Sequence, residues 1–517
     1  HDRALAPQRR RGKPPYSWGE GAGKAPLWRA VRIGTILTAV EAKKGSRVIG
    51  ELADSIARQV DNLTGTVSEA FMEPVIRVGV TGLARAGKTV FITSLVANLL
   101  NRGRMGGMAV EAQGRIEAAY LQPQPDDTVP RFQFEEHLSA LTGGNPYWPT
   151  STRTVSELRL SLRVKPRGLL GGLSGARIVH VDIVDYPGEW LLDLGLMSKS
   201  YAEWSDDVFV RLARRAEATD FLKEAESVQG DDPFEEPAAQ ALAASFTAYL
   251  TAARDAGYYD CTPGRFLLPG ALEGSPVLTF APLAKVEGAG RKSLWREMER
   301  RYEAYKSKVV TPFFREHFAK IDRQVVLIDA LGAIHKGPEA LEDMRRAMSD
   351  ILSAFKPGQN AFLKRLFMGR RVEKILFAAT KADHLHHVQH TALTGIVEAL
   401  VRAASDRASF AGAEVRAMSI AALRATEEAE MRHDGEMLKL VRGKLLESGK
   451  HAALYAGALP ADPSKLLQPA REGAERWLEE DYQIMNFAPA VLELARGDGP
   501  PHIRLDRAAE FLIGDRL

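Results

Sequence analysis

Hydrophobic positions divide the N-terminal part of the chain into two contrasting stretches. From Ile49 to Phe71, apolar residues recur at three- and four-residue steps, which predicts an amphipathic helix over 48–71. Its apolar stripe spans fewer than four heptads, so packing within its own domain is favoured over a coiled-coil partner. Residues 1–45 are rich in Lys, Arg, Pro and Gly and predict a disordered basic arm. Weak attachment of this arm to an anionic membrane is the alternative to a simple solvated tail.

Farther along, five short apolar runs predict buried strands separated by helical patterns. These runs are the segments 75–80, 178–186, 324–331, 374–380 and 414–419. Strands that alternate with helices predict an α/β fold, a doubly wound and mostly parallel sheet with helices on both of its faces. The block 191–322 has mostly helical texture and an aromatic stripe, which is typical of a core. We therefore expect it to be a helical insertion subdomain.

The amino-acid composition is that of a globular protein and does not by itself indicate a substrate or a reaction. The 517 residues are 45% hydrophobic and 26% charged, with a net charge of +3, as expected for a globular protein of several domains. This charge gives no case for nucleic-acid binding, which needs a concentrated basic face. Cys261 is the only cysteine, which favours a reducing cytosol. No apolar run approaches the roughly 18 residues of a membrane span, and the basic first 30 residues lack the apolar core of a signal peptide.

A phosphate-binding pattern follows the first predicted strand. The segment GLARAGKT (82–89) matches G-x-x-x-x-G-K-[ST] and precedes an apolar helix, which is the context that this motif requires. Its glycines let successive N–H groups curl toward phosphate oxygens, and the helix presents its positive end to the same anion. Lys88 is expected to reach the β- and γ-phosphates, and the Thr89 hydroxyl to ligate Mg²⁺. The predicted nucleotide-binding residues of this segment are Gly82, Leu83, Ala84, Arg85, Ala86, Gly87, Lys88, Thr89 and Val90.

The second predicted strand ends in the sequence D-x-x-G. Asp185 can hold Mg²⁺ through a water, and the Gly188 N–H can meet the γ-phosphate, so this loop can sense whether that phosphate is present. Asp182 lies on the same strand but lacks a glycine three residues later, so Asp185 is preferred.

A further threonine ligand of Mg²⁺ is expected in a long loop over 102–152. We choose Thr152, because Thr-Arg followed by an alternating strand is similar to what dynamins and other large GTPases have there. Thr150 is the alternative. The loop is long for a nucleotide-dependent switch, so part of it should form structure of its own.

The fourth and fifth predicted strands end where a P-loop GTPase recognises its base. The Asp383 carboxylate can accept hydrogen bonds from guanine N1–H and the 2-amino group, a pair of donors that adenine lacks. The stem of Lys381 can lie across the base, although Thr380 stands where asparagine is usual. The residues expected to meet the guanine carbonyl through their backbone are Ser419 and Ile420, with Ala421 beside them.

Two residues bear on hydrolysis. Glu189 stands where small GTPases have a glutamine that orients water, and a carboxylate near the γ-phosphate is repelled unless cations compensate, so Glu189 either orients water or points away. Arg85 has the same offset as an arginine of guanylate-binding proteins and atlastins, where it acts as a built-in arginine finger. A surface arginine paired with a neighbouring acid is the alternative.

Four histidines follow the base-reading segment, at positions 384, 386, 387 and 390. His386 and His390 are four residues apart and could share a metal ion on a helix. Because no carboxylate or cysteine in the stretch completes a ligand set, packing beside the base pocket is favoured.

The order of these motifs resembles a P-loop GTPase (P-loop NTPase fold), and the flanking sequences resemble the YcjX family of bacterial stress-associated GTP-binding proteins. The matching stretches are RVGVTGLARAGKTVFITSLV, DYPGEWLLDL, TKADHLHH and PHIRLDRAAEFLIGD, and the resemblance runs from Ile76 to the C-terminus. It implies a cytoplasmic guanine-nucleotide protein linked to envelope stress, with a YcjF-like membrane partner and peripheral contact with the inner membrane. A nucleotide-dependent homodimer is a further expectation, since dimerisation would move Arg85 onto the phosphates.

The sequence therefore predicts a Mg²⁺-dependent GTPase that converts GTP to GDP and phosphate slowly, as a stress-linked switch. The expected catalytic residues are Lys88, Arg85 and Glu189, and the expected metal ligands are Thr89, Thr152 and Asp185. The alternatives are a nucleotide-gated interaction module with negligible hydrolysis and an ATPase. The predicted segments are a GTPase domain (46–190 and 323–425), the insertion 191–322, and an extension 426–517 that ends in a helix packed on the GTPase domain.

Overall fold

The computed structural model describes residues 73–83, 85–150, 154–167, 175–353, 372–410, 412–477 and 481–517. The chain divides into two compact units, His1–Phe71 and Met72–Leu517, and all described residues fall in the second. The predicted basic arm and the predicted helix 48–71 lie outside the described residues. Among the helices that the structure describes, none combines the length and apolar character needed to cross a bilayer.

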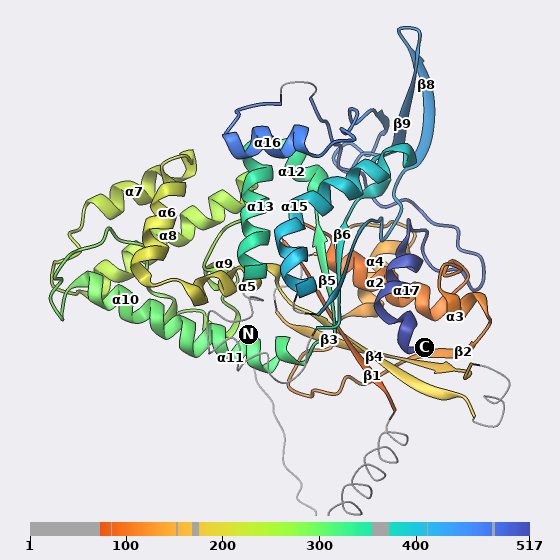
Figure 1. Cartoon of the computed structure of the whole chain (residues 1–517), viewed down its shortest axis with the longest axis horizontal. Helices are drawn as coiled ribbons and strands as arrows, with labels where there is room; N and C mark the ends of the chain where they lie inside the picture. The colour runs from red at the N-terminus through yellow and green to blue at the C-terminus, as the bar shows by residue number, and fades with distance from the viewer. Residues whose placement is uncertain are drawn as a thin grey trace, which may run out of the picture. The chain divides into compact units, whose positions relative to one another are not determined.

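A seven-stranded sheet with the order β2-β3-β4-β1-β5-β6-β7 forms the centre of the second unit (Figure 1). The strands are β1 (Val75–Gly82), β2 (Ile116–Gln122), β3 (Ser156–Val164), β4 (Arg177–Asp185), β5 (Arg323–Ile328), β6 (Lys374–Ala379) and β7 (Glu414–Ser419). Strands β4, β1, β5, β6 and β7 are parallel, whereas β3 pairs antiparallel with β4 and β2 pairs antiparallel with β3. The prediction of a mostly parallel α/β sheet is confirmed, and each of the five predicted strands is present.

Both faces of the sheet are covered, because its central strands are apolar on both sides. In β5, Val325 and Leu327 belong to one hydrophobic core, while Val326 and Ile328 belong to a second core. This division follows from the alternation of side chains along a strand. The sheet is thus doubly wound, and its parallel strands all end at one edge, which is where ligands bind in open α/β sheets.

Helices join the strands and form the two covering layers. Their bounds are α2 (Lys88–Asn101), α3 (Ala109–Ala112), α4 (Phe134–Thr142), α5 (Gly188–Leu192), α6 (Tyr201–Leu212), α7 (Thr219–Glu226), α8 (Glu236–Ala256), α9 (Gly264–Leu267), α10 (Leu294–Tyr305), α11 (Thr311–Glu316), α12 (Ala330–Lys336), α13 (Pro338–Ser353), α15 (His390–Phe410), α16 (Ser464–Glu472) and α17 (Leu505–Ile513). Buried residues of α2 and α17 pack on one face of the sheet, and those of α13 and α15 pack on the other.

The segment between β4 and β5 is helical, as its sequence texture predicts. Helices α6, α7, α8 and α10 gather at the left in Figure 1. They surround aromatic side chains that include Trp204, which stacks on Tyr302 with ring centroids 5.1 Å apart. The predicted aromatic stripe is therefore core. The long loop before β3 contains α3, β2 and α4, which agrees with the expectation that part of it forms structure of its own.

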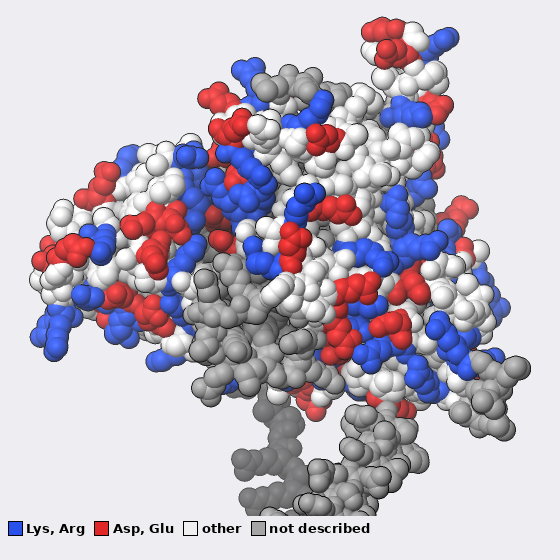
Figure 2. Space-filling model, viewed as in Figure 1, with Lys and Arg blue, Asp and Glu red and all other residues white. Residues whose placement is uncertain are grey.

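A three-stranded antiparallel sheet near the C-terminus was not predicted. It consists of β8 (Glu427–His433), β9 (Glu436–Lys444) and β10 (His451–Leu454). Asp434 and Gly435, both with positive φ, form the tight turn of the β8–β9 hairpin, which extends away from the sheet in Figure 1. Basic and acidic side chains intermingle at the hairpin tip and over the rest of the face in Figure 2.

Candidate nucleotide-binding site

The phosphate-binding loop connects β1 to α2. Gly87 precedes the helix with a left-handed φ of 83°. Glycine adopts this conformation without steric strain. The helix begins directly after it, so the first N–H groups of α2 and the positive end of its dipole face the loop, an arrangement that suits a phosphate. The Lys88 Nζ donates to the Gly82 carbonyl oxygen at 3.1 Å, so the ammonium lies over the loop. Of the other predicted loop residues, Thr89, Leu83 and Ala86 are buried, Val90 is half-buried, Arg85 is exposed, and Ala84 lies outside the described residues.

The D-x-x-G segment lies directly against this loop. A Cβ added to Gly188 would lie 1.9 Å from the Gly82 carbonyl oxygen, so only glycine allows this approach. Asp185 is buried at the end of β4, with 1% of its surface exposed. Asp182, its rival in the sequence, forms a two-pronged ion pair with Arg159 of β3 at 2.6 and 2.8 Å. That pairing gives Asp182 a structural role within the sheet.

A cavity of about 870 Å³ opens beside the loop. Lys88, Arg85 and Glu189 line it. The helical segment between β4 and β5 contributes further lining residues, namely Thr251, Arg254, Asp255, Leu267, Leu268, Pro269, Gly270 and Glu273. Thr150 also lines the cavity, whereas Thr152 lies outside the described residues. The cavity thus brings the three predicted catalytic residues together.

The predicted base-reading turn lies two strands from the loop, at the end of β6. Lys381 adopts a left-handed φ of 59°, and its Nζ forms an ion pair with Asp329 Oδ2 at 2.5 Å. Asp329 follows β5, and its Oδ1 also accepts from the Gly332 N–H at 3.0 Å, which caps α12. The Thr380 N–H donates to the Ile328 carbonyl oxygen at 2.9 Å, so this turn is tied to the strand between it and the loop.

Electrostatics connects the two turns. Burial lowers the pKa of the Lys336 ammonium, the charges of Arg85 and Lys381 lower it further, and Asp329 opposes them. A charge has such an effect only at short range. Arg85 of the phosphate loop and Lys381 of the base-reading turn therefore both act on the Lys336 ammonium.

Asp383 is held by the chain that follows β7. Its Oδ2 accepts from the Ala425 N–H at 2.9 Å, and its carbonyl oxygen accepts from the Thr426 hydroxyl. Asp383 is 5% exposed. These contacts fix the orientation of the carboxylate, which has enough lone pairs to accept further hydrogen bonds.

The backbone groups at the end of β7, which are predicted to meet the guanine carbonyl, have hydrogen-bond partners within the chain. The N–H groups of Ser419, Ile420 and Ala421 donate to Thr394, Ala379 and Ile503, respectively. Ser419 and Ile420 are 1% and 0% exposed. The N–H groups of Ser419 and Ile420 thus have partners within the chain, and only Ala421 pairs with the C-terminal segment. A backbone contact of this strand end with the guanine carbonyl stays a prediction.

Arg504 is a residue of this site that sequence reasoning missed. Its guanidinium donates to the Ser419 carbonyl oxygen at 2.6 Å and to the Ser419 hydroxyl at 2.8 Å. A second guanidinium nitrogen lies 3.0 Å from His390 Nδ1. Arg504 belongs to the terminal stretch PHIRLDRAAEFLIGD, so that stretch braces the base-reading end of the sheet. The signal in the sequence was the resemblance to the YcjX family of this stretch, which lies far from the predicted nucleotide-binding motifs.

The histidines after Asp383 divide into two groups. His384 packs edge-on against Phe487, and the His390 Nε2 lies 2.8 Å from the Ala382 carbonyl oxygen, so both are packing residues, as favoured from the sequence. The pairing of His386 with His390 around a metal ion was wrong, since His390 is engaged by the base-reading turn. His386 and His387 instead lie beside Glu428 of β8.

Comparisons with known proteins identify the family to which the chain belongs. The family model described as "YcjX-like family, DUF463" matches residues 76–517. The chain belongs to the YcjX-like family. It is similar to the "Ras-like GTPase YcjX" of Escherichia coli K12, with 36% identity over 457 residues that cover 86% of this chain and 96% of the relative. It is also similar to the "Ras-like GTPase YcjX" of Shewanella oneidensis MR-1, with 35% identity over 468 residues that cover 86% and 94%.

In this member of the YcjX-like family, the helical segment clasps the chain that follows D-x-x-G. Asp193 Oδ1 accepts from the Gly264 N–H at 2.7 Å, and its Oδ2 accepts from the Tyr305 hydroxyl at 2.5 Å. The Arg265 guanidinium lies 3.1 Å from the centroid of the Trp190 ring. Any movement of residues 188–193 is therefore coupled to α9 and α10.

Proposed function

We propose that this chain binds guanine nucleotides at the carboxyl edge of its sheet and hydrolyses GTP to GDP and phosphate with Mg²⁺ as cofactor. The observation that supports the proposal is that segments 82–89, 185–188 and 380–383 follow parallel strands that end at one edge of the sheet, in the chain order of a P-loop GTPase. The first two segments also lie against each other at Gly82 and Gly188. The name "Ras-like GTPase" of both relatives supports the same activity.

The residues proposed to hold Mg²⁺ are Thr89 and Asp185, with Thr152 as the third. The donor set fits the ion, because Mg²⁺ prefers hydroxyl and carboxylate oxygens, and Thr89 and Asp185 are buried at two loop ends that meet at Gly188. When bound, Mg²⁺ would neutralise negative charge on the phosphate oxygens.

The chain's own residues have separate roles in the proposed reaction. The loop N–H groups and Lys88 bind the phosphates, and the Gly188 N–H donates to the γ-phosphate when that phosphate is present. Arg85 lines the same cavity as Lys88, and it can move onto the transferring phosphoryl group because it is exposed. Glu189 replaces the usual water-orienting glutamine, so hydrolysis without a partner is slow. Asp383 selects guanine and Lys381 covers the base.

A second candidate function is a nucleotide-gated interaction module with negligible hydrolysis. The clasp between Asp193 and the helical segment favours it, since a change at Gly188 is transmitted to α9 and α10. The stress link, a YcjF-like membrane partner, a homodimer and contact with the inner membrane stay predictions of the family resemblance. Co-purification and size-exclusion chromatography with GTP or GDP would test the partner and the dimer.

Single-turnover hydrolysis of radiolabelled GTP distinguishes the two functions. A GTPase releases labelled phosphate in a Mg²⁺-dependent reaction that Lys88→Ala abolishes. If the chain is an interaction module, the wild type binds GTP but releases no more labelled phosphate than the Lys88→Ala variant does. A chain that binds neither GTP nor GDP would contradict both proposals.

A further inference from the structure

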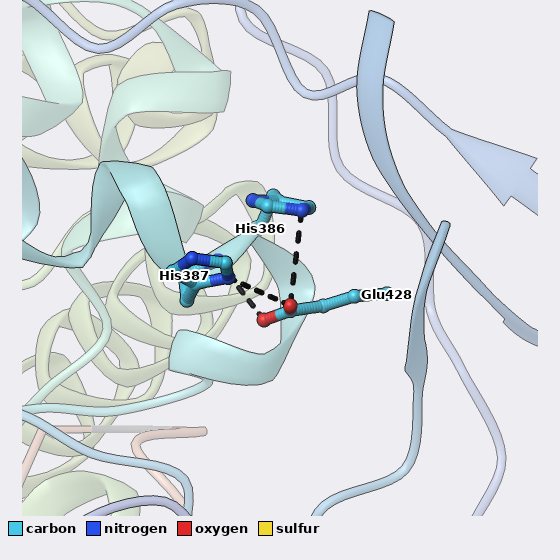
Figure 3. A group of neighbouring side chains, drawn as sticks. All are labelled: His386, His387 and Glu428. Atoms are coloured by element: carbon cyan, nitrogen blue, oxygen red, sulfur yellow. Dashed lines mark hydrogen bonds and ion pairs between the residues drawn. The ribbon is translucent and has the colours of Figure 1, made fainter. Parts of the chain in front are cut away.

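Two histidines and a carboxylate meet beside the base-reading turn, although 41 residues separate them in the sequence. His386 and His387 follow the turn, and Glu428 lies on β8 (Figure 3). Figure 3 shows both imidazole rings directed at the Glu428 carboxylate from one side. His386 is buried, His387 is exposed and Glu428 is half-buried. The group therefore has one rigid member and one side open to solvent.

The spacing of these atoms suits a metal ion. His387 Nδ1 lies 2.7 Å and His386 Nε2 lies 3.7 Å from Glu428 Oε2, and the three ligand atoms all lie within 4.8 Å of one another. Ligands at about 2.1 Å from a tetrahedral ion are about 3.4 Å apart, a value between the two observed distances. Small side-chain rotations would therefore bring all three atoms into a first coordination shell.

The protonation states required for ligation are also accessible. Burial opposes ionisation of Glu428, but the hydrogen bonds from His387 outweigh it and hold the pKa of the carboxyl below its ordinary value. When His387 Nδ1 gives up its proton to ligate the ion, the His387 backbone N–H still donates to Glu428 Oε1 and the metal charge replaces the lost bond, so the carboxylate stays anionic. Ligation through His386 Nε2 needs the proton on Nδ1. That atom now accepts only a long hydrogen bond of 3.5 Å from the Val388 N–H, so little is lost when it becomes a donor.

We propose that His386, His387 and Glu428 bind one Zn²⁺ or a similar divalent transition-metal ion, which links the loop after the base-reading turn to β8. Two imidazole nitrogens and one carboxylate oxygen favour Zn²⁺ over Mg²⁺ or Ca²⁺, because the latter ions prefer oxygen ligands only. Three protein ligands leave the fourth tetrahedral position to water on the side of the exposed His387.

The site extends a series of contacts between two segments. Asp383 accepts from the Ala425 N–H and the Thr426 hydroxyl, and the His387 N–H donates to Glu428 Oε1 at 3.0 Å. A metal ion at the end of this series would hold the base-reading turn against β8. Slower release of a bound guanine nucleotide would follow, and this consequence rests on the proposed function, whereas metal binding itself does not.

The test is metal binding by the full chain without an affinity tag. Protein stripped with a chelator is given saturating Mg²⁺, which occupies sites with oxygen ligands, and is then titrated with Zn²⁺ or Co²⁺. We expect one equivalent to bind, a Co²⁺ absorption band typical of tetrahedral coordination, and an increase in melting temperature with Zn²⁺. His387→Ala and Glu428→Gln should each lower the affinity at least about tenfold.

The matched control is His433→Ala, which removes an exposed histidine at the tip of the same hairpin, beside Asp434. It should bind Zn²⁺ as the wild type does. Circular dichroism confirms that each variant is folded, and His387 is exposed, so its replacement should leave the fold intact. The proposal is overturned if the wild type binds less than a tenth of an equivalent, if His387→Ala and Glu428→Gln bind like the wild type, or if His433→Ala loses the ion as they do.

Discussion

The Gly188 backbone touches the Gly82 carbonyl oxygen, at a distance that leaves no room for a side chain. A residue proposed to sense the γ-phosphate is thereby placed against the first residue of the proposed phosphate-binding loop. The Gly188→Ala variant should force the two segments apart, because its Cβ would lie 1.9 Å from that oxygen.

For Gly188→Ala we expect affinity for a non-hydrolysable GTP analogue to fall at least about tenfold, with little change for GDP, since only the triphosphate needs the Gly188 N–H. Fluorescent-nucleotide titration measures both affinities. Gly106→Ala is the control, because no atom lies within 4 Å of the Cβ it would add. Equal losses for GTP analogue and GDP would show that Gly188 supports the loop without sensing the γ-phosphate.

Arg85 is expected to contribute to turnover more than to binding. Arg85→Ala should lower single-turnover hydrolysis by about tenfold or more and leave GDP affinity near that of the wild type, because an arginine on the transition-state charge acts mainly in that state. Arg254→Ala provides the comparison, since Arg254 lines the same cavity from α8. A larger loss with Arg254→Ala than with Arg85→Ala would assign the catalytic charge to the helical segment instead.

The ion pair of Lys381 with Asp329 is expected to hold the lysine stem in position for the base. Asp329→Asn retains an acceptor for the Gly332 N–H but removes the charge that attracts Lys381. We expect nucleotide to dissociate several-fold faster with little change in stability. Asp329→Ala also removes the helix cap and should cost about 1 kcal/mol of unfolding free energy as well. Stopped-flow release of a fluorescent nucleotide and urea denaturation separate the two effects, and unchanged release from Asp329→Asn would refute the role of the ion pair.

Arg504 should stabilise the base-reading end of the sheet, although the two are far apart in the sequence. Arg504→Ala leaves the Ser419 carbonyl oxygen without its charged donors, which should cost about 1–3 kcal/mol of unfolding free energy and weaken guanine-nucleotide binding. Arg507→Ala is the control, because Arg507 is an exposed residue of α17, the helix that begins directly after Arg504. If both variants have the stability and affinity of the wild type, the C-terminal segment does not brace the site.

The buried Asp193 should make stability depend on pH. Burial raises the pKa of Asp193 to about 7, and the hydrogen bonds from Tyr305 and Gly264 only partly offset this effect. In the unfolded chain the group ionises near pH 4. The stabilisation is therefore complete below about pH 4 and is lost as the pH rises through 7.

Between pH 5 and pH 8, the wild type should lose about 2.5–3 kcal/mol more unfolding free energy than Asp193→Asn, because stability falls by about 1.4 kcal/mol per pH unit up to the folded pKa near 7. Asparagine retains the acceptor for the Gly264 N–H but does not titrate. Urea denaturation at the two pH values measures the difference. Parallel losses in the two proteins would mean that Asp193 is ionised in the folded chain.

The parts of the fold that sequence predicted are those with a local signal. Short apolar runs in the sequence mark the strands β1, β4, β5, β6 and β7. The loop at 82–89 is a contiguous motif, and its Gly87 adopts a positive φ that other residues rarely adopt. The strand β8 carries no such signal, because most of its residues are charged and exposed and their pairing partner lies in β9.

The site was predicted less completely, because several of its contacts join distant parts of the chain. Arg504 contacts Ser419 across 85 residues, and Glu428 contacts His387 across 41 residues. Sequence motifs are defined by residue spacings within one short segment, so they cannot reveal pairs of residues this far apart. The pairing of Ala421 with Ile503 is a further long-range contact that the sequence of β7 alone does not reveal.

The central claim is that Asp383 selects guanine for a nucleotide held by Lys88 and its loop. Competition of GTP, ATP and xanthosine triphosphate against a fluorescent GDP analogue tests it most directly, in the wild type and in Asp383→Asn. The account predicts that the wild type prefers GTP over ATP by at least about two orders of magnitude and that Asp383→Asn prefers xanthosine triphosphate over GTP. Equal affinity of the wild type for GTP and ATP, or an unchanged base preference in Asp383→Asn, would contradict it.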